Sequence, residues 1–176
     1  STGSPKYVKL SKQNILSNAQ SIATFLKLDE NQRPITSLPM YYSFGLSVIN
    51  SHLISGSTIL LTNLSILQKD FWSFLIKAKA TSISGTPYHF EMLDRLKLDN
   101  LNKTNISTMT HAGGRMNTSL LKKLALFCDQ NNLKFFSMYG QTEATARMSF
   151  VPPDKLLAKI GSIGIPIPGG SFELID

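Results

Sequence analysis

The feature that most constrains this chain is a regular alternation of short apolar runs with longer segments that have helical spacing. The runs "ATSISG" (80–85), "ISTMTHAGG" (106–114) and "LKFFSMYG" (133–140) are typical of buried strands. Amphipathic stretches at 87–96 and 120–128 separate them. Strands and helices that alternate with short connections indicate βαβ units. The sequence therefore predicts an α/β fold in which a mostly parallel sheet carries helices on both faces.

The same patterns predict further elements. Ser11 is expected to cap a helix that runs to Leu26, and another helix is expected around 71–78. Between them, a second apolar segment follows Gly45 and ends near Gly56. Further strands are expected at 35–38, 57–62, 145–151 and 172–175.

The chain is expected to have three parts. They are a phosphate-loop segment with its following helix (1–30), an α/β subdomain (31–151), and a linker that starts a further β segment (152–176). The first part lacks a strand before its loop, and the last part ends on a predicted strand. We therefore expect a chain that is truncated at both ends.

The composition, with 42% hydrophobic and 16% charged residues, is that of a globular protein. The single cysteine, Cys128, cannot form an internal disulfide and has the spacing of a core residue, so a cytoplasmic location is expected. No apolar stretch approaches the roughly 20 residues of a membrane span. A net charge of +7 would suit a nucleic-acid partner, but no long basic run supports one. A solvated basic surface is the preferred interpretation.

Polar clusters follow three of the predicted strands, at 84–86, 111–114 and 139–143. Ligands of open parallel sheets bind beyond the carboxyl ends of the strands. We therefore expect these three strand ends to carry ligand-binding groups. His111 is the histidine best placed to touch a ligand, and a role in stabilising its turn is an equal alternative.

The residue types in these clusters suit a nucleotide. Tyr139 offers a flat face to a base, Thr142 a hydroxyl to a phosphate, and Glu143 a hard oxygen to Mg²⁺. The opening stretch "STGSPK" (1–6) offers backbone N–H groups, hydroxyls and one ammonium to phosphates. Taken alone, that stretch is better explained as an ordinary Ser/Gly turn, and it lacks the spacing of the nucleoside-triphosphatase loop.

Five segments, taken in order, resemble the adenylate-forming synthetase superfamily, which includes acyl-CoA and aryl-CoA synthetases, peptide-synthetase adenylation domains and firefly luciferase. The five are "STGSPKYVKLS", "LPMYYSFGL", "HAGGRM", "YGQTE" and "GSIGIPIPG". The resemblance implies that a fatty or aryl carboxylic acid attacks the α-phosphorus of ATP to give acyl-AMP and pyrophosphate. Mg²⁺ would assist, and coenzyme A or the phosphopantetheine arm of an acyl carrier protein would then accept the acyl group.

The resemblance also implies a role for each matching residue. Lys6, Thr142 and Glu143 would be catalytic, and Glu143 would bind the metal. Tyr42 and Gly45 would border the acid pocket, although Tyr42 stands where many relatives carry histidine. The nucleotide would be bound by Thr2, Gly3, Ser4, Lys6, Gly113, Gly114, Arg115, Tyr139, Gly140 and Thr142. A non-catalytic module that holds AMP or ATP is the alternative, because recognition and catalysis are separable.

The family's ribose-binding aspartate and its C-terminal catalytic lysine would correspond to positions beyond Asp176. We therefore predict that the 176-residue chain does not turn over. A pyrophosphate-release assay with ATP and candidate acids checks this, and robust release by the purified chain would contradict it.

Overall fold

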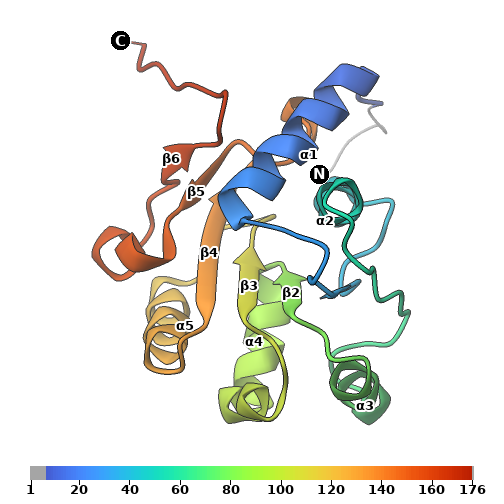
Figure 1. The fold of residues 1–176 in the computed structure, drawn as a ribbon. Helices are drawn as coiled ribbons and strands as arrows, with labels where there is room; N and C mark the ends of the chain where they lie inside the picture. The colour runs from blue at the N-terminus through green and yellow to red at the C-terminus, as the bar shows by residue number, and fades with distance from the viewer. Residues whose placement is uncertain (1–6, 176) are drawn as a thin grey trace.

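The computed structural model describes residues 7–175, in which six strands form a sheet in the order β1-β2-β3-β4-β5-β6 (Figure 1). The first four strands pair in parallel, and β5 and β6 continue the sheet in antiparallel pairing. The predicted mostly parallel sheet is confirmed. The strands are β1 (Pro34–Ile35), β2 (Ser82–Gly85), β3 (Thr108–His111), β4 (Lys134–Tyr139), β5 (Ser149–Val151) and β6 (Ile165–Pro166).

The helices begin at residues that favour helix starts. Ser11 caps the first helix by accepting from the Asn14 N–H at 3.0 Å, and Pro87 opens the fourth. The α-helices are α1 (Lys12–Leu26), α2 (Ser43–Ile54), α3 (Lys69–Lys77), α4 (Pro87–Arg95) and α5 (Thr118–Gln130), and the 3₁₀ turns are η1 (Leu98–Lys103), η2 (Thr142–Ala144), η3 (Pro153–Lys155) and η4 (Leu157–Lys159). None of the helices among residues 7–175 is long and apolar enough to cross a membrane.

Two apolar cores lie on opposite faces of the sheet. Side chains of α3, α4 and α5 form the larger core, and those of α1 and α2 form the smaller one. Because side chains alternate along a strand, β4 sends Phe135 into the first core and Phe136 into the second. Burying each ring stabilises the fold by about 1.5–3 kcal/mol. The predicted covering of both faces is therefore confirmed.

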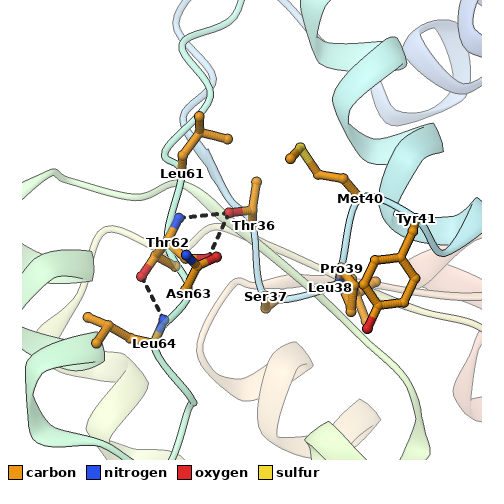
Figure 2. Close-up of a pocket in the computed structure, with 10 residues that line it drawn as sticks. All are labelled: Thr36, Ser37, Leu38, Pro39, Met40, Tyr41, Leu61, Thr62, Asn63 and Leu64. Carbon is orange, nitrogen blue, oxygen red and sulfur yellow. Dashed lines mark hydrogen bonds between the residues drawn. The ribbon is translucent and has the colours of Figure 1, made fainter.

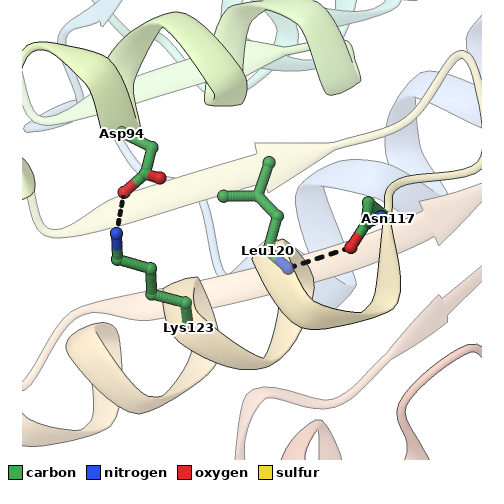
Figure 3. A network of polar contacts seen from close by, with 4 residues as sticks. All are labelled: Asp94, Asn117, Leu120 and Lys123. Atoms are coloured by element: carbon green, nitrogen blue, oxygen red, sulfur yellow. Dashed lines mark hydrogen bonds and ion pairs between the residues drawn. The ribbon is translucent and has the colours of Figure 1, made fainter.

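Polar contacts add to the packing of α4 and α5 (Figure 3). The Lys123 ammonium lies 2.6 Å from an Asp94 carboxylate oxygen, but both side chains are partly exposed, so the pair contributes at most about 1 kcal/mol. The Asn117 side chain caps α5 by accepting from the Ser119 and Leu120 N–H groups. Cys128 is buried in the larger core, where desolvation raises its pKa to about 12. This agrees with the predicted core thiol.

Two strand predictions near the start of the sheet are corrected. β1 ends at Ile35 because the Ser37 N–H turns back to the Ile35 carbonyl, at 2.9 Å. The run 57–62 forms no strand, and Leu60 alone makes a bridge to Ile35. The Leu60 N–H donates to the Pro34 carbonyl, and the Leu60 carbonyl accepts from the Thr36 N–H just after β1. A single bridging residue does not make a ladder.

The later strand predictions are also adjusted. β5 covers only the end of the predicted 145–151 run, because Thr145 and Ala146 have φ values of 60° and 84°. The strand expected at 172–175 does not form, since no segment among residues 7–175 pairs with it. The short β6 was not predicted, because Pro166 lacks an N–H and resembles loop sequence.

The register of the parallel strands positions the site. Gly85 pairs with His111, and His111 pairs with Ser137, so β2, β3 and β4 end at the same edge. The polar clusters that follow these strands therefore meet at the carboxyl edge, as expected from the sequence.

Candidate functional site

A cavity of about 610 Å³ opens at the carboxyl edge of the sheet. The turn after β3, made of Gly113, Gly114 and Arg115 and called here the 113–115 turn, forms one wall. Tyr139 and Gly140, where β4 ends, form another. Residues 161–163, which begin the "GSIGIPIPG" motif, form a third wall of the cavity. The cavity therefore unites five residues predicted to bind the nucleotide.

The 113–115 turn depends on its first glycine. Gly113 has φ +81°, and a Cβ there would lie 2.3 Å from the hydroxyl oxygen of Tyr42. The turn thus needs a residue without a side chain, both for its conformation and for the space that Tyr42 fills. Tyr42, predicted to border the acid pocket, is in this way brought against the predicted adenine turn.

A second close approach shapes the loop of residues 140–146, called here the 140–146 loop. A Cβ at Gly140 would lie 1.6 Å from the Ala146 carbonyl oxygen, so the chain can return directly over Gly140 only because it is glycine. This folding leaves Thr142 and Glu143 exposed, and Tyr139 before them is 41% exposed. The predicted phosphate, metal and base ligands are therefore open to a ligand.

The start of α2 meets the 140–146 loop. The Ser43 hydroxyl lies 3.0 Å from the Thr142 hydroxyl. No side chain caps the first turn of α2, so the positive end of this helix is not neutralised by a cap. At α5, by contrast, the Asn117 side chain already occupies two of the first N–H groups. The start of α2 therefore places N–H groups without a side-chain cap close to Thr142.

The histidines have different environments. His111 lines the cavity but is only 3% exposed, and desolvation lowers its pKa to about 4, partly offset by a hydrogen bond to the Gly114 backbone. It is therefore neutral at pH 7, and its contact with the turn leaves both predicted roles standing. His89 joins Thr86 in a capping box, which confirms a cap. His52 is buried with Nδ1 2.8 Å from the Val48 carbonyl, which confirms a structural role.

Other predicted residues lie apart from the cavity or cannot be placed. Thr2, Gly3, Ser4 and Lys6 lie outside the residues that the structure describes. Gly45 does not line the cavity, because it is buried one turn into α2, where a Cβ would lie 2.2 Å from the Pro39 carbonyl oxygen. Its role at the acid pocket stays a prediction.

Sequence reasoning did not identify several residues of the site. Ser43 carries no local signal, because its contact with Thr142 joins residues 99 positions apart. Arg147, predicted as part of a strand, instead precedes β5 next to the site, where its charged side chain is 1% exposed. The cavity also has walls from Met116, Thr118, Leu121, Ser137, Met138, Gly161, Ser162 and Ile163. Of these, 161–163 belong to a motif that the sequence had already singled out.

A second cavity, of about 750 Å³, lies between the 36–41 and 61–64 segments (Figure 2). Its polar groups hold the two segments together. The Thr36 hydroxyl accepts from the Thr62 N–H at 2.9 Å and so joins the two segments, whereas the Thr62 hydroxyl accepts from the Leu64 N–H at 3.1 Å within the 61–64 segment. It contains no charged side chain and none of the predicted site residues. The cavity beside Tyr139 is therefore the better candidate for an anionic ligand.

Known proteins are similar in sequence to this chain over nearly its whole length. A family model described as AMP-binding enzyme matches residues 1–176. The mitochondrial medium-chain acyl-CoA ligase of Rattus norvegicus is 29% identical over 99% of this chain and 29% of its own length. The 2-succinylbenzoate–CoA ligase of Bacillus licheniformis is 28% identical over 98% of this chain and 35% of its own length. The chain thus spans about a third of the length of these relatives.

Solved structures share the fold. The N-terminal domain of FACL13 from Mycobacterium tuberculosis has a TM-score of 0.81 at 20% identity, over 94% of this chain and 41% of that one. The O-succinylbenzoate coenzyme A synthetase of Bacillus subtilis in complex with AMP has a TM-score of 0.77 at 26% identity, over 94% and 33%. A structure of the same enzyme with ATP and magnesium ion also matches, with a TM-score of 0.77 at 26% identity, over 94% and 34%.

The buried histidines predict acid sensitivity. His52 and His111 have pKa values of about 4 in the folded chain, whereas a histidine in the unfolded chain titrates near 6.5. Between these values the unfolded state binds more protons, so the free energy of unfolding falls as pH decreases from 6.5 toward 4. Each group contributes up to about 3 kcal/mol to this loss.

Urea unfolding at pH 7 and pH 4.5 measures the effect. His111→Gln should reduce the acid-dependent loss by less than half, because His52 still titrates and burial also lowers the pKa of His89. An equal loss in wild type and variant would show that His111 does not remain neutral on folding.

Proposed function

Because this chain belongs to the AMP-binding enzyme family, we propose that its carboxyl-edge cavity binds the adenylate part of ATP in a carboxylate-activating ligase. The observation that supports this most is the convergence of the 113–115 turn, Tyr139 and Gly140 on one cavity. Thr142 and Glu143 follow Gly140 in the chain and are exposed, but they do not line the cavity. Its volume of about 610 Å³ lies within the range of small-molecule sites.

In this proposal the base stacks on Tyr139 and lies along the 113–115 turn. Tyr139 is exposed on the cavity wall, and the neighbouring Gly113 and Gly114 allow a planar ligand close to the backbone. The neutral imidazole of His111 adds no charge to this wall. The charged group that the 113–115 turn brings to the cavity is Arg115, which is exposed to solvent.

The phosphates would extend toward Thr142, Glu143 and the start of α2. Glu143 and the Thr142 hydroxyl supply hard oxygen atoms, and one carboxylate together with phosphate oxygens is a usual set of Mg²⁺ ligands, so the residues present fit the ion. Mg²⁺ would offset the charge of the phosphates. Lys6, Thr2, Gly3 and Ser4 are proposed to bind the β- and γ-phosphates.

The carboxylic acid would approach from the side of Tyr42 and Ser43. Its carboxylate oxygen would attack the α-phosphorus and displace pyrophosphate, and a thiol would then take the acyl group from the acyl-AMP. Such a site must hold two anions, the carboxylate and the α-phosphate, in line for attack. The start of α2, which no side chain caps, lies beside both Tyr42 and Thr142, and its positive end would favour these anions. The acid is not assigned, and coenzyme A or a carrier thiol is the proposed acceptor. The complete reaction is proposed for a longer protein, because the chain spans about a third of its relatives.

Calorimetric titration with AMP tests the base site. Tyr139→Ala should weaken AMP binding between about 5-fold and 100-fold, since a base–aromatic stack contributes about 1–3 kcal/mol. Tyr88→Ala is the matched control, because Tyr88 is 58% exposed on α4 and lies outside the cavity. Equal AMP affinity in the Tyr139 variant, or no binding by the wild-type chain, would contradict the proposal.

A further inference from the structure

Arg147 is a buried cation that has no carboxylate partner. Its side chain is 1% exposed, and no Asp or Glu among residues 7–175 forms an ion pair with it. Desolvation lowers its pKa to about 9, so it stays charged at pH 7. One of its terminal nitrogens has no hydrogen-bond partner among those residues. Burying a charge without an ionic partner raises the free energy of the folded state. The polar and aromatic groups around Arg147 must therefore offset part of this cost.

The contacts of Arg147 join three elements. Its Nε donates to the Ser47 hydroxyl on α2 at 3.1 Å, and its guanidinium carbon lies 5.1 Å from the centre of the Phe44 ring on the same helix. A terminal nitrogen lies 3.8 Å from the Met138 sulfur on β4. The Asn18 side chain of α1 donates to the Arg147 carbonyl at 2.7 Å. One residue thus holds α1 and α2 on the sheet.

Arg147 also follows directly after the strained end of the 140–146 loop. Thr145 and Ala146 both adopt positive φ, which non-glycine residues rarely do unless neighbouring structure enforces it. The loop is closed by hydrogen bonds from the Thr145 N–H to the Thr142 carbonyl and from the Ala146 N–H to the Gln141 carbonyl. A fixed anchor after Ala146 is therefore needed to keep this shape.

The loop contacts α2 at two points on one helix face. Ser43 and Ser47 are four residues apart, so they lie above one another along α2. Ser43 contacts Thr142 inside the loop, and Ser47 contacts Arg147 at its end. The helix that begins at the proposed acid pocket thus contacts the loop that carries the proposed phosphate and metal ligands.

We propose that Arg147 is a positioning residue, which fastens the 140–146 loop to α2 and so sets Thr142 and Glu143 relative to Tyr42. The consequence for ligand binding rests on the nucleotide site proposed above, but the fastening itself does not. Arg147 does not itself line the cavity, although one of its terminal nitrogens lies 3.8 Å from the sulfur of Met138, which does. Its contacts with Ser47 and Phe44 lie on the α2 side of the loop, so its loss should affect the phosphates and largely spare the base.

Amide hydrogen exchange of the 176-residue chain tests the fastening without any ligand. In Arg147→Met, the amides of Ala144, Thr145 and Ala146 should exchange at least roughly tenfold faster than in wild type, while amides of β3 and α4 keep their rates. Methionine fills a similar volume, and apolar replacement of a buried charge often preserves stability. Arg95→Met is the matched control, because Arg95 is exposed at the end of α4.

Binding of two probes then tests the consequence. Arg147→Met should bind Mg·ATP about tenfold more weakly and adenosine equally well, whereas general destabilisation would weaken both. Unchanged loop exchange in the folded variant would overturn the proposal. If Arg147→Met did not fold, Ser47→Ala would serve as the second variant, because it removes the hydrogen bond to Arg147 Nε. It should show the same changes in loop exchange and Mg·ATP binding, with smaller magnitude. Absence of nucleotide binding by wild type would refute the proposed function, and loop exchange would still test Arg147.

Discussion

The parallel pairing of β2, β3 and β4 is the constraint on which the rest of the structure depends. Gly85, His111 and Ser137 stand side by side, so the chain leaves all three strands at one edge. Helices cover both faces of the sheet, so the polar residues that follow the strands gather at its carboxyl edge. Those after β3 and β4 line one cavity although they are far apart in sequence, whereas the 84–86 cluster after β2 does not line it.

Two close backbone approaches turn that edge into a defined site. Tyr42 lies over Gly113, and the Ala146 carbonyl lies over Gly140. The first joins α2 to the proposed base wall, and the second folds the 140–146 loop so that Thr142 and Glu143 are exposed. Both approaches need glycine, and the positive φ of Thr145 and Ala146 adds strain that the contacts of Arg147 hold in place. The site thus requires glycine at both places where other parts of the chain approach its backbone.

The sequence predicted those parts of the fold that local patterns determine. The apolar runs of β2, β3 and β4, the Ser11 cap and the convergence of polar clusters were all found, because each follows from neighbouring residues. The run 57–62 was assigned wrongly, since a strand also needs a partner, and only Leu60 finds one. The burial of Arg147 could not be read from "TARMSFV", because Phe44 and Ser47 enclose it from about a hundred positions away. The same separation hid the contact of Ser43 with Thr142.

The location of the nucleotide is tested most directly by titrating the ¹⁵N-labelled chain with AMP and following the amide resonances. The site described here predicts the largest shifts in the 113–115 turn, at Tyr139 and Gly140, and in the 161–163 segment, which line the cavity. Residues 36–41 and 61–64, around the second cavity, should not respond. Shifts centred on these two segments would contradict the assignment of the carboxyl edge as the nucleotide site.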